Sequence, residues 1–299
     1  MNHSRINWRW WLLVLAYYVI ACLSHLQFSL WLVRQRDTFL GHMAFADWVP
    51  GVSLLAGLGL LLWVGTQLRR SPRPWLTGGY WLLWLAAAAL IDRFLTFSVN
   101  EYAHYPQYAM LAWLLARALD PQRSRWYVGR VLFWTTLLGI GDELLQYLWI
   151  TTSYSDYLDF NDFLTNLVAA AAGLLLYYGA AAGPTDGSQQ RRAPMLEWCV
   201  LGAIVLALTA GFQSGRIVLN PAEKIPPGGI VQGADGSYRC YLQRAPDLYG
   251  AWPSGPRRGR YHVLRPMSAL LLMLGVGLPF AGYGRWPRRK GVGLGPSAS

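Results

Sequence analysis

The fold is decided by two neighbouring stretches, Gly139-Ile-Gly-Asp-Glu-Leu-Leu-Gln-Tyr147 and Asp159-Phe-Asn-Asp-Phe-Leu-Thr-Asn166. Each belongs to a long apolar segment, yet each carries acids and amides at the end that faces the polar connection between them. Burying such groups near lipid costs on the order of several kcal/mol unless they are paired or used. We therefore expect two membrane-spanning helices whose facing ends form a functional site.

The composition of the whole chain is typical of a membrane protein. Of its 299 residues, 54% are hydrophobic and only 14% are charged. An apolar helix needs about 20 residues to cross a bilayer. The apolar runs therefore predict an all-α membrane protein with about eight transmembrane helices, at approximately 10–33, 48–68, 75–95, 105–119, 131–150, 161–181, 195–212 and 266–283.

The positive charge of the chain predicts its orientation in the membrane. The net charge is +11, and many of the arginines lie in short loops between apolar runs, such as Arg69, Arg70, Arg123, Arg130, Arg191 and Arg192. Short basic loops are typical of the cytoplasmic side. We therefore expect both termini to be cytoplasmic, the lipid bilayer to surround the protein, and no nucleic-acid partner.

The predicted helices divide the chain into three parts. Residues 1–95 hold the first three helices, 96–182 a core of three more, and 183–299 the last two together with an external segment at 213–264. Within that segment, 229–242 predicts a small β-hairpin around an Ala-Asp-Gly turn, resting on the helix ends as a cap. An irregular external loop is the alternative. The tail after Lys290 is expected to be disordered.

The acids and amides of the two central stretches lie at similar membrane depths. If the fifth helix leaves the cytoplasm near Arg130, Asp142 lies about 18 Å along it and Gln146 about 24 Å. Residues four apart share a helix face, as Asp142 and Gln146 do, and as Asp162 and Asn166 do at the outer end of the sixth helix. Both pairs are therefore expected in the outer half of the membrane.

The region before the fourth helix adds further polar side chains. Glu101, His104 and Tyr108 are spaced by three and four residues and share one side if the helix begins early. Pro106 also allows 101–104 to be a turn that leads into the helix. We expect several of these side chains to contact one another in one external-facing polar pocket: Glu101, His104, Tyr108, Asp142, Glu143, Gln146, Asp162 and Asn166.

The order of these residues resembles the VanZ-like family of integral membrane proteins, named for an accessory protein of teicoplanin resistance. The resemblance covers about 96–179 and is carried by Glu101, His104 and Tyr108, then Asp142, Glu143 and Gln146, then Asp159, Asp162, Asn166 and Gly173. It implies a bacterial plasma-membrane protein that binds or modifies a lipid-linked or peptidoglycan-related cell-envelope component, with a connection to glycopeptide antibiotic resistance. The arginine usual in the family's turn is replaced here by Asp156. If that arginine balances the family's acids, Arg93 has to substitute for it here; otherwise the site is more negative than in the family.

The resemblance and the chemistry of the residues together suggest roles for the site. The catalytic residues, if a reaction occurs, would be Glu101, His104, Asp142, Glu143 and Asp162. The substrate-binding residues would be Tyr108, Gln146, Asp159, Asn166 and Arg93. Acids beside a histidine form a workable acid/base pair or take up a cation, but their spacing matches no standard metal motif, so no metal site is predicted. Catalysis itself, the cofactors and the protein partners stay open.

Two other functions remain as alternatives. In the first, the protein is a non-enzymatic accessory or scaffold protein, and the polar cluster fixes how the helices pack. In the second, it is a proton-coupled transporter, because intramembrane acids with a histidine suit proton relay. The inward parts of the helices, 109–115 and 167–176, are almost wholly apolar, which argues against a pathway across the membrane.

Overall fold

The computed structural model describes residues 8–34, 45–124, 126–152, 155–181, 194–227, 229–233, 235–255 and 259–283, except for the side chains of 25–34 and 45–50. These residues are mostly helical, as the sequence predicts. The helices are α1 (Trp8–Arg34), α2 (Phe45–Arg70), α3 (Pro74–Phe94), α4 (His104–Leu119), α5 (Val128–Leu145), α6 (Phe160–Tyr178), α7 (Met195–Gln213) and α8 (Pro266–Gly282). The tail that we expect to be disordered lies outside the described residues.

Several of the described helices have the length and composition of membrane spans. Four are long and apolar enough to cross a bilayer: residues 51–70 of α2, and α3, α6 and α7. The apolar stretches 8–24 and α8 are shorter. Residues 51–70 of α2 and helix α7 expose most of their large apolar side chains, as expected of helices that face lipid. These features indicate a membrane protein, as the composition predicts.

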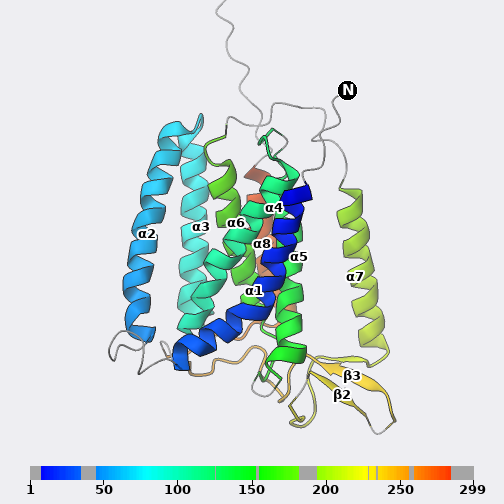
Figure 1. The fold of residues 1–299 in the computed structure, drawn as a ribbon. Coiled ribbons are helices and arrows are strands. Elements are labelled where there is room, and N and C mark those ends of the chain that lie inside the picture. The colour runs from blue at the N-terminus through cyan, green and yellow to red at the C-terminus, as the bar shows by residue number, and fades with distance from the viewer. Residues whose placement is uncertain are drawn as a thin grey trace, which may run out of the picture.

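Helix α6 is the central helix of the bundle. Almost all of its residues are buried, and it packs against α3, α4, α5 and α8 (Figure 1). Its small residues, Ala169 to Ala172 and Gly173, allow the neighbouring backbones to approach closely. A Cβ atom added at Gly173 would lie only 2.1 Å from the carbonyl oxygen of Ala109 in α4. Helices α4 and α6 therefore touch backbone to backbone at this point.

Asp120 organises the turn between α4 and α5. Its Oδ1 accepts from the backbone N–H of Ser124 at 2.9 Å, and its Oδ2 accepts from the Trp126 N–H at 2.8 Å and from the Tyr178 hydroxyl at 3.1 Å. The Tyr177 hydroxyl donates to the backbone carbonyl of Asp120 at 2.7 Å. Both carboxylate oxygens of this buried acid are therefore satisfied, which is usual for a buried polar group with a structural role.

The segment between α7 and α8 contains the predicted hairpin. Strands β2 (Ile230–Gln232) and β3 (Tyr238–Tyr241) pair antiparallel, and the Gly233 N–H donates to the Ser237 carbonyl at 2.8 Å across the turn. Strand β1 (Ile217–Val218) adds a parallel edge beside β3, which the sequence analysis does not predict. The sheet lies at the end of the bundle where α7 finishes (Figure 1).

This segment packs on the connection between α5 and α6. The Tyr147 hydroxyl donates to the Tyr241 carbonyl at 2.8 Å, and the Leu158 N–H donates to the Leu242 carbonyl at 2.9 Å. The Arg244 N–H donates to the Asp156 carbonyl at 2.7 Å. The segment therefore covers the ends of these helices, and the expectation of a cap is confirmed.

Asn161, in the first turn of α6, joins three parts of the chain. Its Nδ2 donates to the carbonyls of Leu95 and His262 at 2.9 and 2.8 Å, and its Oδ1 accepts from the Leu264 N–H at 3.0 Å.

Asn161→Ala should lower the free energy of unfolding by about 3 kcal/mol, because it leaves buried backbone groups unpaired. Thermal unfolding in detergent measures the loss. Gln213→Ala, which removes an exposed carboxamide at the end of α7, is the control, and an equal shift in both variants would contradict the assignment.

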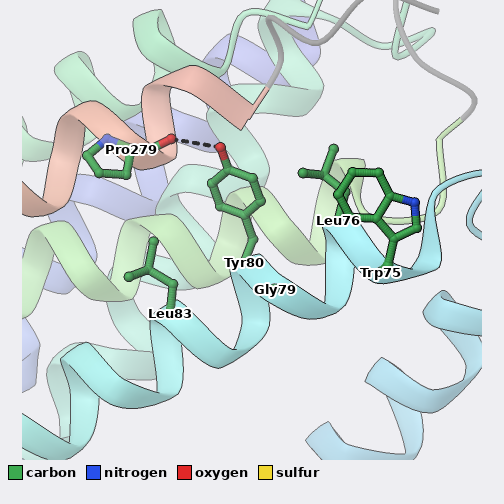
Figure 2. A pocket seen from close by; sticks show the side chains of 6 residues that line it. All are labelled: Trp75, Leu76, Gly79, Tyr80, Leu83 and Pro279. Atoms are coloured by element: carbon green, nitrogen blue, oxygen red, sulfur yellow. Dashed lines mark hydrogen bonds between the residues drawn. The ribbon is translucent and has the colours of Figure 1, made fainter. Parts of the chain in front are cut away.

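An apolar surface groove lies between α3 and α8. It is lined by Trp75, Leu76, Gly79, Tyr80, Leu83 and Pro279 (Figure 2). The Tyr80 hydroxyl donates to the Pro279 carbonyl at 3.0 Å across it. None of the polar residues selected from the sequence lines this groove. Most of them lie instead at the buried ends of the helices.

Candidate functional site

The site forms where α4 begins, α5 ends and α6 begins. A 3₁₀ turn, η1 (Val99–Ala103), precedes α4, and Pro106 lies in the first turn of α4. The Glu101 carboxylate accepts from the N–H groups of Phe97 and Ser98 and so closes the turn. Of the two conformations that the sequence allows for 101–104, the structure has a turn that leads into the helix.

Helix α5 continues into a π-helical turn, η2 (Gln146–Ile150). The Thr151 N–H donates to the Gln146 carbonyl at 2.8 Å, five residues earlier. Such wide turns hold one residue more per turn than an α-helix and occur often at functional sites. The fifth helix predicted from the sequence extends to residue 150 and therefore includes this turn.

Helices α4 and α5 meet at Asp142, which has no exposed surface. Its Oδ2 accepts from the Tyr108 hydroxyl at 2.6 Å and from Gln107 Nε2 at 3.4 Å. Its Oδ1 has no hydrogen-bond partner among the described residues. The described hydrogen bonds therefore hold this acid through one oxygen only.

Asn166 of α6 connects the histidine of α4 with an acid of α5. Its Nδ2 donates to Glu143 Oε1 at 3.2 Å, which places its carbonyl oxygen toward His104. That oxygen lies 2.7 Å from His104 Nδ1 and accepts a hydrogen bond from the Nδ1–H. The amide therefore fixes the orientation of the imidazole ring and puts a proton on Nδ1.

Asp162 of α6 completes the group. Its Oδ2 lies 4.0 Å from His104 Nε2, and Glu143 Oε1 lies 3.7 Å from His104 Nδ1. His104, Glu143 and Asp162 are all buried and each offers one ligand atom, with these atoms within 4.8 Å of one another. These three residues could therefore hold a metal ion. We call His104, Tyr108, Asp142, Glu143, Asp162 and Asn166 the polar centre.

Two further acids lie at the edge of the polar centre, outside the helices. Asp159 caps α6 by accepting from the Asn161 N–H at 2.8 Å. Burial, and then the neighbouring Asp162, raise the pKa of Asp159 to about 8. Burial, and then Asp162 and Asp159, raise the pKa of Glu101 well above its ordinary value. The Asp159 carboxyl group is therefore expected to hold a proton near neutral pH.

The remaining predicted site residues are placed differently. Gln146 is buried, and its Nε2 has no hydrogen-bond partner among the described residues. Arg93 is exposed at the end of α3 and lies over the Phe94 ring, with its Cζ 5.5 Å from the ring centre. No described ion pair joins Arg93 to the acids. The structure thus brings together the acids, the histidine and Asn166, but among the described residues it shows no contact between this group and the side chain of Gln146 or Arg93.

A different basic residue reaches the turn after Gln146. Arg244, from the segment between α7 and α8, is 3% exposed. Its guanidinium donates to the Thr152 carbonyl, and its Cζ lies 5.3 Å from the centre of the Tyr147 ring. Arg244 could not be identified from the sequence because it lies about 90 residues along the chain from its partners, and no local pattern marks it.

Two other neighbours of the polar centre were not selected from the sequence. Gln107 donates to Asp142, and its backbone carbonyl accepts from the Tyr17 hydroxyl of α1. It follows His104 by three residues, so helical spacing could have identified it. Cys22 of α1 is buried beside Asp142. The sequence gives no signal for that contact, since the two residues lie on distant helices.

Comparison of the chain with family models, with curated proteins and with solved structures gives no match.

Proposed function

We propose that this chain is a VanZ-like protein of the bacterial plasma membrane, with eight spanning helices and cytoplasmic termini. In this proposal, the polar centre faces the outer side and binds or modifies a lipid-linked or peptidoglycan-related component of the cell envelope. His104 and its neighbouring carboxylates act as an acid/base pair, while Tyr108, Asn166 and Gln146 orient the bound group. A connection to glycopeptide resistance follows from the family resemblance alone.

The proposal rests on a difference in hydrogen bonding between the buried acids. Asp120, at the far end of α4, has partners on both carboxylate oxygens. Asp142 and Asp162 each keep one buried oxygen without a hydrogen-bond partner among the described residues. An unpaired buried acceptor costs about 1 to 3 kcal/mol. A centre that retains two of them is better suited to receiving a ligand than to holding helices together.

The packing around the polar centre favours a site reached from one side over a transport pathway. The inner part of α6, from Ala169 to Leu175, is buried against its neighbours, and Gly173 touches the α4 backbone. The scaffold alternative has support of its own, because Asn166 joins α4, α5 and α6 through His104 and Glu143. Substitutions that preserve the fold can distinguish the binding or catalytic function from the scaffold function.

The test uses purified protein reconstituted into vesicles that carry a labelled polyprenyl-diphosphate-linked disaccharide-peptide. Binding is measured by retention of the label, and conversion by the change in mass of the lipid. The unsubstituted protein should bind or convert this lipid. Asp142→Asn and His104→Ala should each reduce the signal at least tenfold, because removing a group that takes part in acid/base catalysis typically costs 10²-fold or more.

Matched controls keep the result interpretable. Asp142→Asn removes charge but not shape, and its amide oxygen can still accept from Tyr108. Glu223→Gln changes an exposed acid in the outer segment and should leave binding unchanged. Failure of the unsubstituted protein to bind or convert the lipid would overturn the proposed function. If both variants were as active as the unsubstituted protein, the polar centre would not be the site of this function. Loss of folded protein in both variants would support the scaffold function.

A further inference from the structure

The polar centre contains a set of side chains that suits a cation. His104, Glu143 and Asp162 come from three successive helices and are 5%, 5% and 8% exposed. Their ligand atoms lie within 4.8 Å of one another. Metal–ligand distances of about 2.0–2.2 Å place neighbouring ligand atoms roughly 3.4 Å apart in a tetrahedral site. A shift of up to about 1.4 Å, within reach of side-chain rotation, would bring these three atoms onto one ion.

The unpaired oxygens around this set point to a ligand independently of the cluster itself. Asp162 Oδ1 is buried and has no hydrogen-bond partner among the described residues, and the same holds for Asp142 Oδ1. The Asp142 carboxylate lies close enough to act electrostatically on both Glu143 and Asp162. A bound cation would give these buried oxygens the partner that the protein does not supply.

The histidine is oriented in the manner of a metal ligand. Ligating histidines almost always donate their second ring N–H to a carbonyl or a carboxylate, which fixes the tautomer. His104 Nδ1 does this toward Asn166 Oδ1 at 2.7 Å, while Nε2 is the ring nitrogen paired with Asp162, at 4.0 Å. Asn166 also donates to Glu143, so one amide positions two of the three candidate ligands.

The charge of the centre also favours a cation. Asp142, Glu143 and Asp162 are three acids in a buried volume, and within the described ranges no lysine or arginine forms an ion pair with any of them. Uncompensated buried charge is costly. A divalent ion would offset the repulsion between the acids, and His104 supplies the nitrogen donor that distinguishes this set from an all-oxygen calcium site.

We infer that His104, Glu143 and Asp162 bind one divalent transition-metal ion, of the Zn²⁺ or Mn²⁺ type, and that Asn166 positions the ligands and Asp142 lies next to the ion. One imidazole with carboxylates is a donor set that both ions accept. The inference rests on the proposed function in that it concerns the same centre. Metal binding is measured without turnover, so the two can fail separately.

The experiment uses the full chain purified in detergent, stripped with a chelator, desalted and then titrated with Zn²⁺ and with Mn²⁺. Elemental analysis should give one ion per chain at saturation for the unsubstituted protein. Glu143→Gln and Asp162→Asn should each weaken binding at least a hundredfold. Asn166→Leu should weaken it about 10- to 100-fold, as is typical when a partner of a ligating histidine is removed. Glu223→Gln is the control and should bind normally.

Two further readouts show whether a loss of metal reflects the site or the fold. Co²⁺ bound in place of Zn²⁺ should give visible absorption that Asp162→Asn abolishes. The metal-free Asp162→Asn protein should unfold at or above the temperature of the metal-free unsubstituted protein, because the replaced oxygen has no hydrogen-bond partner to lose. Less than about one ion per ten chains in the unsubstituted protein would overturn the metal site. So would binding by both Glu143→Gln and Asp162→Asn that is as tight as in the unsubstituted protein.

The outcomes also separate this inference from the proposed function. Metal binding without binding or conversion of the envelope lipid would retain the metal site and reject the function. Lipid binding or conversion by a protein that takes up no ion in the titration would retain the function and reject the metal site.

Discussion

Gly173→Ala is expected to lower the free energy of unfolding by about 3 kcal/mol or more, at the upper end of the cost of overpacking. The added Cβ would lie 2.1 Å from the Ala109 carbonyl oxygen and 2.8 Å from its carbonyl carbon. Both atoms belong to the backbone of α4, so no side-chain rotation relieves the clash. The two helices would have to separate by about 1 Å to restore normal contact distances.

The expected change in the free energy of unfolding has the opposite sign to that of an ordinary glycine-to-alanine substitution in a helix. In an open helical position, glycine to alanine favours the helix by about 1 kcal/mol. Gly202 of α7 is such a position, with nothing within 4 Å of an added Cβ, so Gly202→Ala should be neutral or stabilising. Thermal unfolding of the two variants in the same detergent makes the comparison. Equal melting temperatures would contradict the close contact between α4 and α6.

Asp120→Ala is expected to destabilise the protein by about 3 to 5 kcal/mol. The substitution leaves three buried donors without an acceptor, namely the N–H groups of Ser124 and Trp126 and the hydroxyl of Tyr178, each at about 1 to 3 kcal/mol. The turn also holds Arg123 and Trp126 at φ values of 54° and 50°, a conformation that non-glycine residues adopt only when the surrounding structure enforces it.

A graded series tests this role of Asp120. Asp120→Asn keeps one carbonyl oxygen as an acceptor and should lose less stability than Asp120→Ala. Asp156→Ala removes an exposed acid from the opposite connection and should change the melting temperature little. If Asp120→Ala unfolds at the same temperature as Asp156→Ala, the hydrogen bonds of Asp120 do not stabilise the turn as we describe.

The sequence predicts the positions of the described helices well, because apolar runs of helical length are a strong local signal. It also predicts that Asp142, Glu143 and Asp162 lie near one another, as they do in the structure; whether they form a functional site stays a prediction. The convergence of His104, Asn166 and Glu143 confirms that the three helix ends meet. The count of eight spans, the orientation in the membrane and the function stay predictions.

The features that the sequence analysis missed depend on contacts between distant segments. Arg244 approaches the turn after Gln146 from about 90 residues away, and Cys22 reaches Asp142 from the first helix. Asp120 stands before a proline in an apparent loop, so nothing local marks the hydrogen bonds that it accepts from Trp126 and Tyr178. Strand β1 has two residues, too few for an alternating pattern to indicate a strand.

The wide turn Gln146–Ile150 makes the protein more tolerant of new side chains there than of a changed number of residues. Trp149 projects outward and is 64% exposed, so its replacement would disturb little. Deleting one residue after Tyr147 would remove the additional residue of this turn, and so rotate and shift the chain that follows. The Thr152 carbonyl would then turn away from Arg244. Natural variants of this turn should therefore differ in composition while preserving its length.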